Sequence, residues 1–152
     1  MKIKPTIDDN RLRQKFTKQI QTQPRQVQIA LGRTAEFLMD IIKTRTQKGK
    51  DADRRSFLPY KPEYKAFRRK EGRQVKYPDL NFSGQMLSGM VQRANPKQAV
   101  LFFQKFQNIK AVRNQKKRPF FLIGDNERKT LINFFAKEFK KLSVLKWVNE
   151  KT

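Results

Sequence analysis

The chain has 152 residues, and 36 Lys and Arg against 13 Asp and Glu give it a formal net charge of +23. That length suits one domain with one hydrophobic core, and the charge is far beyond what solubility requires, so we expect an acidic partner. The absence of Cys and His excludes disulfide frameworks, zinc fingers, thiol nucleophiles and imidazole bases.

The start of the chain lacks an apolar core of signal-peptide length, and apolar stretches elsewhere are only a few residues long. We therefore expect a soluble protein that is synthesised in the cytoplasm. Residues 1–23 are predicted to form an N-terminal arm or a short helix, because Leu12, Phe16 and Ile20 are spaced four apart behind two aspartates that can cap.

Residues 24–145 are predicted to form a single α+β domain, followed by a C-terminal tail over residues 146–152. The domain opens with a long helix, because Pro24 suits a first helical turn and an apolar stripe at helical spacing runs on until Thr46.

Residues 50–78 are predicted to form an extended basic loop with a short helix near residues 63–70. Apolar residues thin out here, and prolines and a glycine interrupt the pattern. From residue 43 to residue 76 there are 13 Lys and Arg against four Asp and Glu, so this stretch is the electropositive centre of the chain. We expect it to be mobile in an isolated subunit, because it has few apolar groups to bury.

The second half of the chain is predicted to contain a hairpin and a final helix. Residues 85–93 begin as a short helix or strand, and residues 90–93 pair with the apolar strand 98–103. A basic loop over residues 105–118 then leads to the last helix, which begins at Asp125 and carries an apolar stripe at Leu131, Phe135, Phe139 and Leu142. The predicted fold is a small antiparallel sheet packed against two main helices.

Two kinds of chemistry can be weighed from the residues. Asp79 with Glu127 and Lys129 superficially fits the pattern of magnesium-dependent nucleases, but the last two residues lie in the first turn of the predicted final helix, not on a strand. The glycines form no phosphate-binding spacing. We predict neither an enzyme nor a bound metal or cofactor. The basic stretches with interleaved aromatic residues leave a nucleic-acid-binding protein as the alternative function.

Five motifs in order resemble the tailed-bacteriophage virion-morphogenesis proteins, a family that includes neck and tail-completion proteins of the head-tail junction. The resemblance spans residues 41–139. The motifs are IIKTRT at 41–46, GKD at 49–51, FLPY at 57–60, DLNFSGQML at 79–87 and RPFF at 118–121. The chain departs from the family at residues 54–55, where many relatives have a glycine, and at residues 111–114, where they often have a histidine.

The resemblance implies a structural protein of the virion that joins a ring at the head-tail junction. Its partners would be connector or adaptor proteins, tail proteins and other copies of itself, with contact to packaged DNA as a further option and no membrane. We expect partner contacts from basic, aromatic and methionine side chains of the extended basic loop over residues 50–78 and of the segments near it. These residues are Arg54, Arg55, Phe57, Tyr60, Tyr64, Arg68, Arg69, Met86, Met90, Arg118 and Phe120. Phe120 and Phe121 are either both core residues or point to opposite faces.

Overall fold

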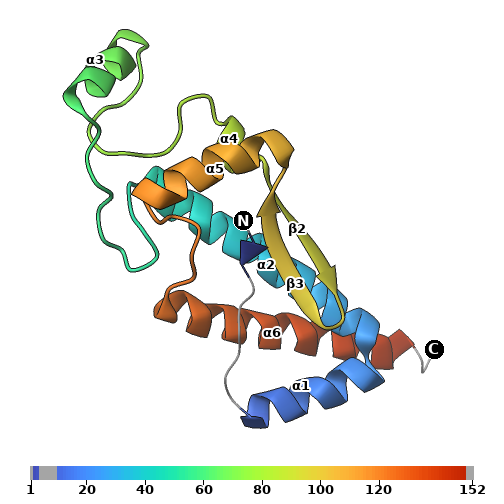
Figure 1. The fold of residues 1–152 in the computed structure, drawn as a ribbon. Helices are drawn as coiled ribbons and strands as arrows, with labels where there is room; N and C mark the ends of the chain where they lie inside the picture. Colours follow the sequence, from blue (N-terminus) through green and yellow to red (C-terminus); the bar gives the residue numbers. More distant parts are fainter. Residues whose placement is uncertain (1, 4–9, 150–152) are drawn as a thin grey trace. The chain divides into compact units, whose positions relative to one another are not determined.

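The computed structural model describes residues 2–3 and 10–149, and its description of side chains covers residue 14 and residues 17–143 (Figure 1). The fold is α+β, as predicted: helices pack with a small antiparallel sheet. The elements in chain order are β1 (Lys2–Ile3), α1 (Asn10–Thr22), α2 (Pro24–Gln47), α3 (Pro62–Lys70), α4 (Gln85–Ser88), β2 (Met90–Asn95), β3 (Gln98–Phe103), α5 (Lys105–Lys117) and α6 (Asp125–Asn149).

The chain divides into two compact units. Unit 1 contains Met39–Val91 and Phe102–Gly124, and unit 2 contains Lys2–Leu38, Gln92–Leu101 and the segment that begins at Asp125. The division falls within α2, β2 and β3, so each of these elements contributes to both units. The single domain expected over residues 24–145 stays a prediction.

Within unit 2, the first half of α2 packs against both the hairpin and α6. The side-chain amide of Gln28 donates to the carbonyl oxygen of Ala94 in β2 at 3.1 Å. On the α6 side, the rings of Phe37 and Phe134 stack with their centres 4.4 Å apart. These contacts confirm the expected packing of two main helices with a small sheet.

The hairpin is confirmed. β2 and β3 are joined by a turn in which the side-chain oxygen of Asn95 accepts hydrogen bonds from the backbone N–H groups of Lys97 and Gln98, at 2.8 and 2.9 Å. This local pairing is typical of Asn in turns. β1 adds to the other edge of β3, which gives the strand order β1-β3-β2.

α6 begins at Asp125 as predicted and continues to Asn149, into the segment predicted as a C-terminal tail. No proline or glycine interrupts residues 125–149. Leu131 is buried, whereas Phe135 and Phe139 are only half-buried and stack on each other. The predicted stripe therefore has only part of its residues in the core, and the stacked Phe134 was missed.

The N-terminal helix is present as α1. The proposed caps Asp8 and Asp9, and the side chains of Leu12 and Phe16, lie outside the described residues. None of the helices in the described part of the chain is both long and apolar enough to cross a membrane.

The prediction of a basic loop over residues 105–118 was wrong, because residues 105–117 form α5 and only Arg118 follows it. Lys, Arg and Gln are good helix formers, and neither proline nor glycine breaks the segment. Ala111 is fully buried on the inner side of the helix. The basic side chains of the segment mark the exposed side of a helix, not an irregular loop.

The excursion over residues 50–78 is less irregular than expected. It contains α3, close to the predicted short helix, and a short bridge between Lys50 and Ser56. It also buries side chains: Phe57 is 6% exposed and Arg68 is 1% exposed. The segment therefore has more of an interior than its composition indicates, with an arginine and aromatic rings in it. Its mobility in an isolated subunit stays a prediction.

The core of unit 1 is largely aromatic. Phe120 and Phe121 are both buried, and their rings lie 6.0 and 4.9 Å from the ring of Phe103. Of the two options left open by the sequence, the structure therefore places both phenylalanines in the core. Phe120 is not on the surface of the unit.

Candidate functional site

A groove of about 790 Å³ lies in unit 1, and α5 forms one of its walls. The opposite side comes from residues 58–61 with Tyr64 and Arg68, and from Leu80, residues 82–84 and Met86. The described residues that line the groove include no Asp or Glu. Its cations are Lys61, Arg68, Lys110, Arg113, Lys116, Lys117 and Arg118. Arg68 is paired with Asp79, which does not line the groove, and the other six cations create a positive potential that attracts an acidic ligand.

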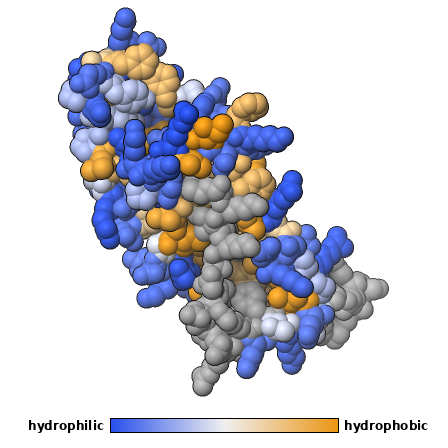
Figure 2. Space-filling model, viewed as in Figure 1, coloured by the Kyte–Doolittle hydropathy of each residue, from blue (hydrophilic) through white to orange (hydrophobic). Residues whose placement is uncertain are grey.

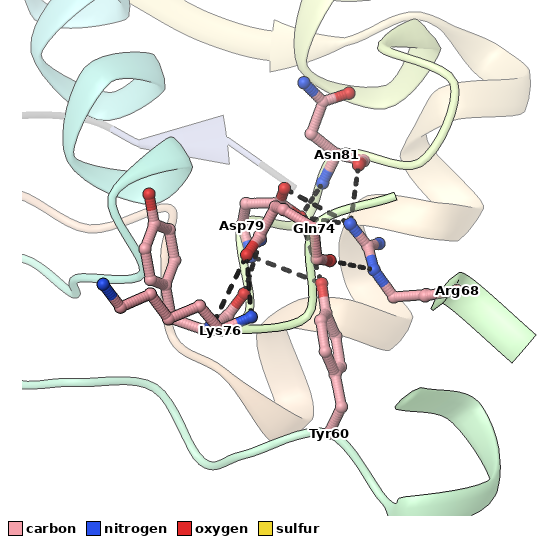
Figure 3. A network of polar contacts seen from close by, with 7 residues as sticks. Tyr60, Arg68, Gln74, Lys76, Asp79 and Asn81 are labelled. Atoms are coloured by element: carbon pink, nitrogen blue, oxygen red, sulfur yellow. Dashed lines mark hydrogen bonds and ion pairs between the residues drawn. The ribbon is translucent and has the colours of Figure 1, made fainter. Parts of the chain in front are cut away.

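Behind this groove lies a buried polar network centred on Arg68. Its Nη2 group contacts Asp79 Oδ1 at 3.1 Å and Oδ2 at 3.3 Å, and its Nε group donates to the carbonyl oxygen of Gln74 at 2.9 Å. In Figure 3 the side chains of Arg68, Asp79 and Tyr60 point toward one another. An arginine can be buried in this way only when its charge and donors are matched, so Arg68 serves the interior of the unit.

Tyr60 shares the same carboxylate. Its hydroxyl donates to Asp79 Oδ1 at 3.1 Å, and the side chain is 8% exposed. Burial, followed by the negative charge of Asp79, raises the pKa of Tyr60 to about 12, against the opposing effect of Arg68. The hydroxyl is therefore a neutral hydrogen-bond donor at physiological pH, with no readiness to lose its proton.

The network holds a strained backbone in place. Leu80 has φ 50°, in the left-handed region that side chains rarely adopt. The next residue is held by two hydrogen bonds: the Asn81 N–H donates to Asp79 Oδ1 at 3.0 Å, and Arg68 donates to the Asn81 carbonyl at 3.3 Å. A strained backbone conformation of this kind persists only where several surrounding contacts hold it in place. The groove wall formed by residues 80–84 is thus fixed from behind.

The other wall is tied to the same network through Arg118, which follows α5. Its guanidinium donates to the carbonyl oxygens of Leu58 and Pro59 at 2.9 and 3.1 Å. It also lies 5.2 Å from the centre of the Tyr60 ring, and the Arg68 guanidinium lies 4.8 Å from that centre. These cation–π contacts and hydrogen bonds hold the two sides of the groove together.

A second anchor joins the end of α2 to the segment after α5. Arg45 is 1% exposed and donates to the carbonyl oxygens of Phe120 and Leu122 at 2.9 and 2.6 Å. The chain then turns at Gly49, where φ is 73° and a side chain would press on Tyr77 and on the Pro78 carbonyl. Only glycine suits both the conformation and the space.

The eleven residues predicted to contact partners fall into two sets. Six are buried and support the groove and the unit from inside: Phe57, Tyr60, Arg68, Met86, Met90 and Phe120. Exposed or partly exposed are Arg54, Arg55, Tyr64, Arg69 and Arg118. The sequence pattern did not separate these sets, because an arginine in a charge-rich stretch gives no local sign that it will be buried. A contact role for the exposed set stays a prediction.

The outer face of α5 was missed because the segment was interpreted as a loop. Phe106 is 82% exposed and Ile109 is 55% exposed, and both line a shallow hollow between α4 and α5. In the region of α4 and α5, the face drawn in Figure 2 shows hydrophobic side chains among hydrophilic ones. The signal was available in the spacing of Phe106, Ile109, Lys110, Arg113 and Lys117, which share one helical face.

The nuclease pattern finds no support in the geometry around Asp79. Both carboxylate oxygens contact the Arg68 guanidinium, and one also accepts from Tyr60. Among the described residues there is no group of three or more carboxylate, imidazole or thiol side chains that could hold a metal ion. Asp79 therefore takes part in a structural ion pair and hydrogen bonds.

No protein-family model, curated protein or solved structure matches this chain.

Proposed function

We propose that this chain is a structural protein of the tailed-phage virion, of the neck or tail-completion type, which forms part of a ring at the head-tail junction. In this proposal it is needed for virion assembly and has no catalytic task. The proposal begins from the resemblance of five ordered motifs between residues 41 and 139.

The geometry of unit 1 supports the proposal, because all five motifs contribute to one framework. Arg45 from the first motif anchors the backbone at Phe120 in the last, and Tyr60 from the third bonds Asp79 from the fourth. Gly49 from the second motif accepts a hydrogen bond from the Phe57 N–H at 2.9 Å. Motifs that define a family fold are expected to contribute residues to the same structural unit.

The single observation that carries the functional part is the groove, which has six cations besides the paired Arg68 and no carboxylate among its described lining residues. A ring subunit needs surfaces that meet unlike neighbours, and an excess of one charge selects neighbours of the opposite charge. The buried network keeps this surface in shape without using its exposed lysines. Phosphates of packaged DNA or of another nucleic acid are the alternative ligand, in keeping with the same charge.

The test uses a phage that encodes the protein, with the gene deleted and supplied from a plasmid. We expect the deletion to leave heads and tails unjoined in electron micrographs, and mass spectrometry to find the protein in purified virions. Lys61→Glu with Lys116→Glu in the groove should reduce joined particles. Lys129→Glu with Lys137→Glu on α6, an equal change of charge on exposed residues, should not.

Infectious particles formed without the gene, or virions that lack the protein, would refute the virion role. Hydrogen exchange of residues 50–77 provides a second measurement: these amides should be more protected in assembled particles than in the free protein. Binding to DNA that falls steeply with salt, together with absence from virions, would favour the nucleic-acid-binding alternative.

A further inference from the structure

The outer face of α5 combines exposed apolar and basic side chains in one line. Phe106 and Ile109 stand at the beginning of the helix, and Lys110, Arg113 and Lys117 continue the same face toward its end. All five side chains are exposed, with Phe106 at 82%. A largely exposed phenylalanine beside an exposed isoleucine is costly to leave in water, so this face is suited to being covered.

The face is presented on a firmly held helix. On the side of α4, the Gln104 N–H donates to the Gly89 carbonyl at 3.1 Å, and a side chain at Gly89 would collide with that of Gln107. Asn114 contacts the Met86 sulfur at 3.5 Å, and Ala111 is fully buried. The outer residues therefore keep their relative positions before any partner arrives, which lowers the entropic cost of binding.

Lys110 and Arg113 line both the basic groove and the shallow hollow that holds Phe106 and Ile109. They form a basic ridge between these two apolar side chains on one side and the basic groove on the other. A segment that covers Phe106 and extends along the helix must cross this ridge. Its apolar residues would meet the beginning of α5, and its charges would meet the end.

The chemistry of the occupant follows from these two requirements. Carboxylates are needed for the ridge, and apolar side chains are needed for Phe106 and Ile109. A nucleic acid would satisfy the cations and could stack on Phe106, but it would gain little from an exposed aliphatic side chain. A second copy is poorly matched, because its 36 cations face only 13 carboxylates. In the described residues several of these carboxylates are already paired, as in Asp79 with Arg68 and Glu138 with Lys141.

We propose that the outer face of α5 docks an acidic amphipathic segment of a different protein, with its apolar side on Phe106 and Ile109 and its carboxylates on Lys110, Arg113 and Lys117. This inference rests on the proposed function, in that it names the chemistry of a virion neighbour. It is a helix-on-helix or strand-on-helix contact in which apolar anchors give affinity and the charges select the partner.

The probe is a labelled synthetic peptide with leucines on one helical face and glutamates on the rest, measured by fluorescence anisotropy against the full chain at about 0.15 M salt. A peptide of the same composition in scrambled order tests whether amphipathicity matters. Oligothymidine tests the nucleic-acid outcome. We expect the ordered peptide to bind at least tenfold more tightly than the scrambled one.

Three pairs of substitutions locate the site. Phe106→Ser with Ile109→Ser removes the apolar anchors, and Arg113→Glu with Lys117→Glu reverses the charges; each should weaken binding of the ordered peptide about tenfold or more, which equals about 1.4 kcal/mol. Lys129→Glu with Lys137→Glu on α6 is the matched control and should leave binding unchanged. All six residues are exposed, so circular dichroism and the melting temperature should stay close to those of the parent chain.

Equal binding of ordered and scrambled peptides would overturn the proposal, as would no effect of the α5 substitutions. Tighter binding of oligothymidine that the same substitutions abolish would reassign the face to nucleic acid and overturn it as well. These results are separable from the virion test. If the virion test fails but the α5 substitutions weaken peptide binding, only the virion role is refuted. If virion assembly requires the chain but the α5 substitutions do not affect peptide binding, only the α5 proposal is refuted.

Discussion

Arg68 and Asp79 form an ion pair of 3.1 Å whose two side chains are 1% and 11% exposed, with Arg68 in α3 and Asp79 eleven residues later, just past the end of the excursion. The pair is the link between α3 and the segment that shapes the groove. Since the same carboxylate accepts from Tyr60 and from the Asn81 N–H, one residue joins the segment before α3, α3 itself and the segment that follows Asp79.

Asp79→Ala should lower the free energy of unfolding by about 3–5 kcal/mol, because it leaves the buried guanidinium of Arg68 without its counter-charge. Asp53→Ala is the matched control: its ion pair with Arg55 at 2.9 Å is exposed and should be worth no more than about 1 kcal/mol. Chemical denaturation followed by circular dichroism measures both. Similar small losses at the two positions would show that the buried pair does not support the unit.

Gly49→Ala should destabilise the protein more than Gly72→Ala does. Both glycines have positive φ, 73° and 64°, so both substitutions incur the left-handed strain of about 1–2 kcal/mol. Only at Gly49 would the new methyl group press on neighbours, 3.0 Å from a Tyr77 ring atom and 3.1 Å from the Pro78 carbonyl, whereas nothing lies within 4 Å at Gly72. We expect a further loss of about 1–3 kcal/mol at Gly49, and equal losses would contradict the close packing described there.

The phenol of Tyr60 should titrate near pH 12, two units above its ordinary value of 10.0. Because the pKa is raised in the folded state, the stability linked to it is complete below pH 10 and is lost as the pH rises through about 12. Phenolate absorbance during an alkaline titration measures this directly. The component near pH 12 should vanish in Tyr60→Phe, and its persistence in that variant would assign the raised pKa to another group.

Acid should weaken unit 2 through Glu138. Its pKa is lowered from 4.5, first by the hydrogen bond from Lys141 at 2.7 Å and then by that from Arg33 at 2.8 Å. A lowered pKa contributes stability that is present above pH 4.5 and is lost as the pH falls through the lowered value. Carboxyl titration by NMR should show Lys141→Met raising the pKa of Glu138 more than Arg33→Met does. The reverse order would contradict this ranking of its partners.

The parts of the fold that the sequence predicted are those with local signals. Pro24 marks the start of α2, the apolar run over residues 98–103 marks β3 of the hairpin, and Asp125 marks the start of α6. Each depends on residues within a few positions of one another. Helix caps, turns and strand pairs of this kind can be recognised before any tertiary contact is known.

The groove could not be predicted in the same way. Its rear support requires Arg68 to be buried, and burial of an arginine depends on a carboxylate that a long loop brings back to it. Its α5 wall was interpreted as a loop because the basic residues received more weight than their helical spacing. The spacing of Phe106, Ile109, Lys110 and Arg113, at intervals of three and four residues, indicates a helix, but it does not indicate the hollows beside that helix.

The division of the chain into units also bears on the order in which it folds during synthesis. Unit 1 is made of segments that all lie between Met39 and Gly124, so its contacts are available once Gly124 has left the ribosome. Unit 2 needs α6: until that helix is synthesised, Phe37 has no Phe134 to stack on and Arg33 has no Glu138. The side of the first half of α2 that faces α6 is therefore uncovered in the nascent chain for the time that α6 takes to emerge, and this interval is when the chain is most exposed to aggregation or to chaperones.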